Sequence, residues 1–190
     1  EREDRGRTLV LRRRVHNWTA AEWNGPASSR ETAEATGSCF GGGSGFFEWK
    51  FDDEAIAQLR QARRIRILCE VSARRSDTPQ TGAHRHPTNF ELWVNGLVVH
   101  RAMLPDHPHD TRGALSYLRG GLGAYGYLMR ASIEENLLQR VAEIAAADGA
   151  LRLRCVVPDT AAAPGGLTVY DFDCGRFPIA PTIVIEWDQT

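Results

Sequence analysis

The chain has 190 residues, 42% of them hydrophobic and 25% charged, which are the proportions of an ordinary globular protein. That length allows one domain with a substantial core and excludes a large multidomain enzyme. The formal net charge of −1 argues against a nucleic-acid partner, and no apolar run approaches the roughly 18 residues of a membrane span. We therefore expect no nucleic acid and no membrane among its partners. We expect residues 1–7, which are nearly all charged, to form a linker, and residues 8–190 to form a single domain.

Apolar and polar residues alternate in several segments, and a period of two is typical of strands with one buried face. An opening strand is expected near residues 8–11, and Phe47, Trp49 and Phe51 share one face of the next. The clearest alternation covers residues 65–74. Residues 90–95 alternate as well, and Asn95-Gly96 then favours a hairpin turn into a returning strand at 97–99. Further strands are predicted at 125–133, 151–157, 167–172 and 182–187.

A helical period occurs twice, in a short segment at residues 52–63 and in a longer one at 134–147 that Gly149 follows. About eight strands without an alternation of strands and helices predict an all-β fold, an antiparallel β-sandwich of the jelly-roll type with one or two short helices. We expect the helix near residues 137–145 to lie outside the core. The residues expected to face the shared core are Ile67, Cys69, Phe90, Leu92, Leu153, Ile183 and Ile185.

Residues 15–44, 76–88 and 102–122 are predicted to be long irregular segments, where a functional site is expected. The four cysteines have no C-x-x-C spacing, so a zinc ribbon is not supported. Cys69 and Cys155 fall on the apolar phase of predicted strands and are expected to be core thiols. Cys39 and Cys174 lie in Gly-rich segments and would form a disulfide only if the fold brought them together, so the redox compartment stays open.

The pattern His84-x-His86 followed by Glu91 resembles the first metal motif of the cupins. Cupins need a further histidine in a later strand pair, and no histidine follows His109. A half-site binds metal weakly, and two histidines in a proline-flanked loop are also ordinary. We therefore expect no bound metal and no other cofactor. The sequence also lacks G-x-S-x-G, so nothing in it indicates nucleophilic catalysis.

The hypothesis that the domain binds a sugar rests on its tryptophans. Trp49 and Trp187 share the apolar phase of their strands and are expected in the core, whereas Trp93 shares a face with Glu91 and Asn95. Trp18 and Trp23 lie where no periodicity demands burial. Exposed flat aromatics beside polar side chains suit a sugar, although a tryptophan that plugs one end of the sandwich is the alternative for each. The candidate carbohydrate-binding residues are Trp18, Trp23, Asn24 and Arg176.

Four segments together resemble a known family: residues 92–96 (Leu-Trp-Val-Asn-Gly), 166–170, 175–178 (Gly-Arg-Phe-Pro) and the terminal β-rich run. They are similar to the accessory, galactose-binding-like β-sandwich domains attached to large glycoside hydrolases, particularly those of family two. The resemblance covers roughly residues 8–188 as a pattern. It implies a jelly-roll module without catalytic residues, whose partners are carbohydrate or the catalytic domain of the same polypeptide.

Three classes of function therefore remain open. The first is a noncatalytic accessory or carbohydrate-binding module of a glycoside hydrolase. The second is a purely structural domain that braces its neighbour. The third is a small, cupin-like metal-dependent enzyme with His84, His86 and Glu91 as ligands. Fold analogy alone does not decide among them.

Overall fold

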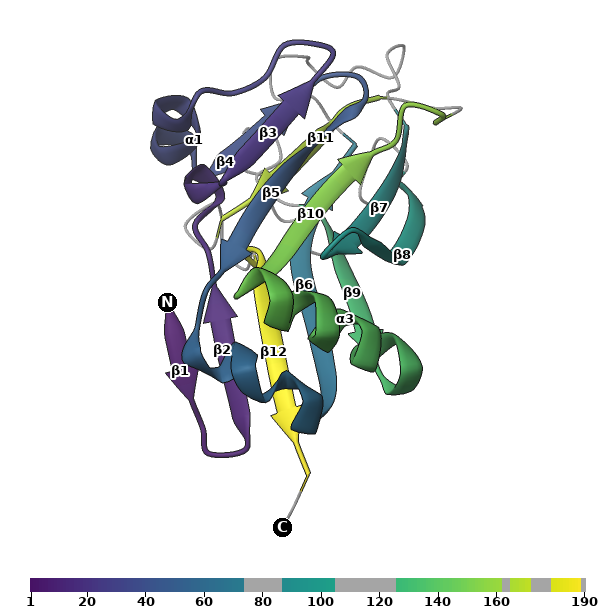
Figure 1. The fold of residues 1–190 in the computed structure, drawn as a ribbon. Coiled ribbons are helices and arrows are strands. Elements are labelled where there is room, and N and C mark those ends of the chain that lie inside the picture. Colours follow the sequence, from purple (N-terminus) through teal and green to yellow (C-terminus); the bar gives the residue numbers. More distant parts are fainter. Residues whose placement is uncertain (74–86, 105–125, 162–164, 172–178, 189–190) are drawn as a thin grey trace.

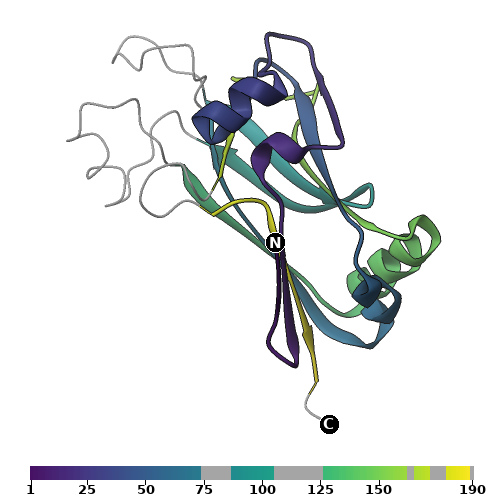
Figure 2. The ribbon, with the colours of Figure 1, turned by 90° about the vertical axis from the view of Figure 1, so that its left-hand side faces the viewer.

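The computed structural model describes residues 1–73, 87–104, 126–161, 165–171 and 179–188, and these form two antiparallel sheets packed as a sandwich (Figures 1 and 2). The larger sheet has the spatial order β1 (Arg2–Asp4), β2 (Thr8–Arg12), β12 (Thr182–Trp187), β6 (Ala62–Ser72), β11 (Leu167–Tyr170) and β4 (Ser38–Gly41), with β9 (Tyr127–Ile133) also paired to β6. The smaller sheet has the order β3 (Ala20–Trp23), β5 (Gly45–Phe51), β10 (Leu151–Val157), β7 (Thr88–Val94) and β8 (Leu97–Leu104). The predicted antiparallel β-sandwich is confirmed.

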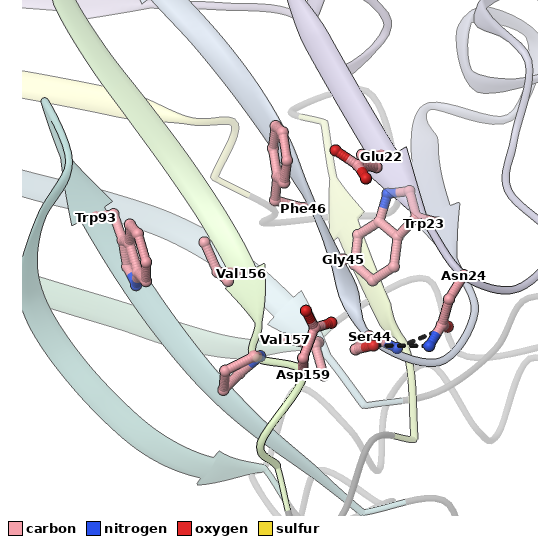
Figure 3. A pocket seen from close by; sticks show the side chains of 11 residues that line it. Glu22, Trp23, Asn24, Ser44, Gly45, Phe46, Trp93, Val156, Val157 and Asp159 are labelled. Atoms are coloured by element: carbon pink, nitrogen blue, oxygen red, sulfur yellow. Dashed lines mark hydrogen bonds between the residues drawn. The ribbon is translucent and has the colours of Figure 1, made fainter.

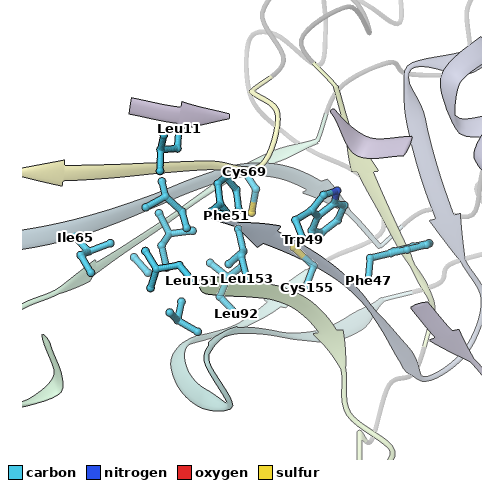
Figure 4. Packing of buried hydrophobic residues seen from close by; sticks show 14 of the residues in the cluster. Leu11, Phe47, Trp49, Phe51, Ile65, Cys69, Leu92, Leu151, Leu153 and Cys155 are labelled. Carbon is cyan, nitrogen blue, oxygen red and sulfur yellow. The ribbon is translucent and has the colours of Figure 1, made fainter. Parts of the chain in front are cut away.

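The core lies between the two sheets and is built by the period-two alternation of the strands. Phe47, Trp49 and Phe51 of β5 are fully buried and face the other sheet, where Cys69 and Leu11 lie among the same apolar side chains (Figure 4). All seven residues predicted to face the core are buried. Cys69 and Cys155 are buried free thiols, as predicted, and Cys39 is buried as well. Burial raises the pKa of the Cys39 and Cys155 thiols. Cys174 lies outside the described residues.

The long helix α3 (Glu135–Asp148) is part of the core, so the prediction that it lies outside was wrong. The helix predicted at residues 134–147 is present. The smaller sheet, however, covers only part of the larger one, and α3 packs over the rest, together with the 3-10 helix η2 (Glu54–Gln61) (Figures 1 and 2). Gly149 ends α3 in the left-handed conformation, with φ 64°. The α3 side chains buried in the core are Leu138, Val141, Ala142 and Ala145.

The segment at residues 15–44, predicted to be irregular, contains four short elements. They are the 3-10 helix η1 (Val15–Asn17), β3, helix α1 (Arg30–Thr36) and β4. Ser29 caps α1 by accepting a hydrogen bond from the Thr32 backbone N–H at 3.2 Å. Each element is too short to show a period, and β4 is a strand because β11 pairs along its whole length.

Both ends of the chain show smaller differences from the sequence-based expectations. Part of the expected linker forms β1, which pairs with β2, and Arg12 binds Glu3 across that hairpin at 2.5 Å. At the other end Trp187 is only partly buried, because a β-bulge between Glu186 and Trp187 interrupts the register with β6. The predicted helix at residues 52–63 is the shorter η2, and β6 begins directly after it. None of the helices described is long and apolar enough to cross a membrane.

Candidate functional site

The smaller sheet has an outer face that α3 and the larger sheet leave uncovered. Residues opposite each other on paired strands share a face, so the register defines rows of side chains across the sheet. One such row contains Glu22, Phe46, Val156, Glu91 and Arg101, which come from β3, β5, β10, β7 and β8 in turn. This outer face therefore carries aromatic, aliphatic and charged side chains side by side.

A hollow of about 320 Å³ lies at the end of this face where β3 and β10 end beside the start of β5; we call it the first hollow. Figure 3 shows Phe46, Val156 and Trp93 projecting from three neighbouring strands, with Asp159 following the end of β10. Two acidic residues at its margin, Glu22 and Asp159, are exposed, and neither has an ion-pair partner among the described residues. The side chains that give the first hollow its chemistry are Glu22, Trp23, Asn24, Phe46, Trp93 and Asp159.

Trp93 is held in place by its neighbours on the outer face. Its indole Nε1 donates a hydrogen bond to Oε2 of Glu91 at 2.7 Å, and Arg101 Nε donates to the other oxygen of Glu91 at the same distance. Because Glu91 and Trp93 are two residues apart on β7, they lie on the same face. The face of the Trp93 ring can therefore be offered to a ligand in a fixed orientation.

Phe46 is held in place in a similar way. The Arg154 guanidinium lies 4.4 Å from the centre of its ring. Arg154 and Arg152 in turn bind the carboxylate of Glu48, at 2.6 and 3.2 Å. Glu48 is only 3% exposed, so this ion-pair cluster fills the middle of the outer face. The open space of the first hollow therefore lies beside this cluster, at the end of the sheet.

Trp23 and Asn24, two of the residues predicted from the sequence, both line the first hollow. The Trp23 ring also packs inward, with its centroid 5.1 Å from that of Phe47, and a Cβ built on Gly41 would overlap it. It thus forms a wall of the hollow and closes the end of the sandwich. The Asn24 amide is tied to Ser44, donating to its Oγ at 2.7 Å and accepting from its backbone N–H at 3.0 Å (Figure 3).

Trp18 does not reach the first hollow. It is 9% exposed, its ring centroid lies 5.1 Å from that of Phe47, and the Arg30 guanidinium lies over its ring at 5.8 Å. Absence of periodicity suggested an exposed ring, but α1 and η1 pack together here and bury it. Trp18 therefore fits the alternative, a tryptophan that plugs the sandwich.

The remaining predicted site residues, Arg176, His84 and His86, lie outside the described residues. Glu91, the third proposed metal ligand, binds Trp93 and Arg101. Within the ranges that the structure describes, no three His, Cys, Asp or Glu side chains are grouped so that they could hold a metal ion.

Sequence reasoning missed Phe46, Glu22 and Asp159. A signal for Phe46 was present, because it alternates onto the polar face of its strand together with Glu48 and Lys50, where an aromatic residue is unexpected. Glu22 and Asp159 had no such signal, since nothing in the sequence brings the ends of β3 and β10 together. The sequence pattern placed Trp93 on the face of its strand that carries Glu91, and the structure shows this to be the outer face; Trp93 was not among the predicted site residues.

No family model matches the chain, and no curated protein matches it. The solved structures that are similar to it include two that cover most of its length. One is a family GH115 4-O-methyl-α-glucuronidase with specificity for decorated arabinogalactans (TM-score 0.42, 9% identity, covering 99% of this chain and 18% of that one). The other contains the tandem CBM51 modules of a family 98 glycoside hydrolase from Streptococcus pneumoniae (TM-score 0.41, 10% identity, covering 94% and 47%). The chain thus spans less than half the length of either, and both TM-scores are too low for an argument about its function.

Proposed function

We propose that this domain is a noncatalytic carbohydrate-binding module of a larger glycoside hydrolase, and that the sugar binds in the first hollow. The observation that carries the proposal is the combination, at one hollow, of two fixed aromatic rings, Phe46 and Trp93, with the carboxylates of Glu22 and Asp159, which have no ion-pair partner among the described residues. Attachment to a glycoside hydrolase, with that enzyme's catalytic domain as partner, rests on the sequence resemblance described above.

Sugar chemistry fits both parts of this surface. The C–H face of a pyranose packs on an aromatic ring, and its hydroxyl groups donate hydrogen bonds to carboxylates. A shallow site of this kind binds weakly, and we expect a Kd of about 0.1 to 1 mM, or about 4 to 5.5 kcal/mol of binding free energy. In this proposal Phe46 and Trp93 form the stacking surface, Trp23 and Asn24 form the wall, and Arg176 remains a candidate hydrogen-bond donor.

The test is a screen of the purified domain on an array of neutral and acidic glycans, followed by calorimetric titration of the best ligand into variants. Trp93→Ala is expected to abolish binding while changing the melting temperature little, because the ring lies on the outer face and outside the core cluster. Leu128→Ala is the matched control, since Leu128 is an exposed apolar residue on β9 of the other sheet. Full affinity in Trp93→Ala, or a folded domain that binds no glycan, would overturn the proposal.

The bracing function is the second candidate. It is supported by the packing of Trp18 and Trp23 on Phe47, since rings that pack on a core residue can stabilise the sandwich. This candidate predicts that no glycan binds and that loss of either ring lowers stability. The array screen separates the two functions, because loss of the buried Trp18 ring is expected to lower stability in either case.

A further inference from the structure

A second hollow, of about 520 Å³, lies on the same outer face next to the first. It is lined by the outer side chains of β7 and β8 and by the residues that follow β10. Pro158 lines both hollows. The two hollows are therefore neighbours on one surface. The residues of the second hollow used below are Glu91, Arg101 and Met103.

The strand register joins the two hollows into one path across the sheet. In the row that contains Glu22, Phe46, Val156, Glu91 and Arg101, the first three residues line the first hollow and the last two line the second. The path thus crosses all five strands at right angles to their direction. A ligand that occupied both hollows would have to be extended.

The path has little to attract an anion. Among the described residues that line the two hollows, Arg101 is the only cation, and its Nε lies 2.7 Å from Glu91. Glu22 and Asp159 lie at the first hollow without an ion-pair partner in the part of the chain that the structure describes, so a carboxylate on the ligand would meet like charges there. The charges of the path therefore suit a ligand that presents hydroxyl groups and no acid.

Apolar contact is available at both ends of the path. Phe46 and Trp93 supply it in the first hollow. In the second, Met103 is 53% exposed, one of two large apolar side chains among the described residues with such exposure. An exposed apolar side chain in this hollow is a favourable surface for the C–H groups of a second sugar.

Building on the proposed function, we infer that the ligand is a neutral glycan chain of at least two sugar units, which lies across the strands with one unit in each hollow. The bond between Trp93 Nε1 and Glu91 joins a residue of the first hollow to one of the second. These two side chains are thus placed to contact consecutive sugar units.

Calorimetric titration with oligosaccharides of increasing length tests this inference. The probes are galactose with the β-1,4-linked galactan oligomers of two to four units, glucose with the cello-oligosaccharides of two to four units, and galacturonic acid with its oligomers of the same lengths. We expect the affinity for one neutral series to rise about tenfold or more from one unit to three, a gain that requires only about 1.4 kcal/mol of added contact. The acidic series is expected to bind more weakly than the neutral one at every length.

The variant Met103→Ala, with Leu128→Ala as its control, tests whether the second sugar unit binds in the second hollow. Met103→Ala should remove most of the gain with chain length and leave monosaccharide binding unchanged, while Leu128→Ala should change neither. Equal affinity for one unit and three, or tighter binding of the acidic series, would overturn this inference and leave the proposed function standing. A folded protein that binds none of the probes and no glycan on the array would overturn the proposed function itself.

Discussion

The indole N–H of Trp93 donates a hydrogen bond to Glu91, two residues earlier on the same strand, at 2.7 Å. Arg101, on the adjacent strand β8, holds the other oxygen of that carboxylate. The ring is thus oriented by protein groups before any ligand arrives. A preorganised ring loses less conformational entropy on binding than a mobile one, so the pair should raise the affinity of the first hollow.

Glu91→Ala removes the acceptor that orients Trp93. We expect it to weaken glycan binding by about 1 kcal/mol or more, since hydrogen bonds to charged groups contribute about 1.5 to 3 kcal/mol in favourable cases. Calorimetric titration measures this change. Glu143→Ala, which removes an exposed carboxylate from α3, is the control and should bind as the original protein does. Unchanged affinity in Glu91→Ala would show that the bond has no role in binding.

Trp18→Ala should act on stability. Because the ring is buried against Phe47, its loss is expected to lower the free energy of unfolding by about 3 to 5 kcal/mol. Trp93→Ala, on the outer face, should cost far less. Denaturant titration of both variants gives the comparison, and equal losses would contradict the placement of the two rings.

Gly41 and Trp23 should be energetically coupled. A Cβ at position 41 would overlap Cδ2 and Cε2 of the Trp23 ring, so Gly41→Ala is expected to cost about 1 to 3 kcal/mol of stability. In a Trp23→Ala background the added methyl group meets empty space, and the cost should largely vanish. A double-mutant cycle from urea denaturation measures the coupling. Additive effects would mean that the ring does not lie on Gly41.

Glu186 gives a prediction for pH. Burial alone would raise its pKa, but hydrogen bonds from Arg64 and Arg66 outweigh burial and hold the pKa below the ordinary glutamate value. A carboxyl with a lowered pKa in the folded state adds stability above its unfolded pKa and loses it as the pH falls through the folded pKa. Glu186→Gln should therefore destabilise the protein near neutral pH, with a difference that shrinks below about pH 4.

The free energy of unfolding of Glu186→Gln and of the exposed control Glu143→Gln, measured by denaturant titration from neutral pH to below about pH 4, tests this prediction. The control should follow the original protein at every pH. A difference for Glu186→Gln that persists undiminished in acid would show that the lost stability does not come from the ionised carboxylate.

The strands could be predicted from the sequence because each has one buried face, and burial imposes a period of two on the residues themselves. Ile67 and Leu92 were placed correctly for this reason. Short elements could not be predicted from the sequence. The four-residue strand β4, for example, is defined by its pairing with β11 and not by a pattern of its own residues. The position of α3 in the core could not be predicted either, because it depends on how far the smaller sheet extends over the larger one. No local sequence pattern indicates that extent.

The candidate site was only partly predictable for a related reason. Trp23 and Asn24 were named as candidates because they lie in a segment without periodicity, and both line the first hollow. The same reasoning predicted an exposed Trp18, which α1 and η1 cover. Phe46 and Trp93 come together because β10 pairs with both β5 and β7. That pairing joins residues far apart in the chain, so the hollow could be recognised only in the folded structure.

The most direct measurement of the central claim is the NMR spectrum of the indole N–H groups during a glycan titration. Each of the five tryptophans contributes one signal, which Trp→Phe variants assign. On addition of the trisaccharide that gives the largest heat in the calorimetric panel, the Trp93 signal should move. The Trp49 signal should stay, because that ring is buried, and so should the Trp187 signal, because that ring ends β12 in the other sheet. A moving Trp187 signal with a stationary Trp93, or no movement of any signal at saturating glycan, would contradict binding on the outer face.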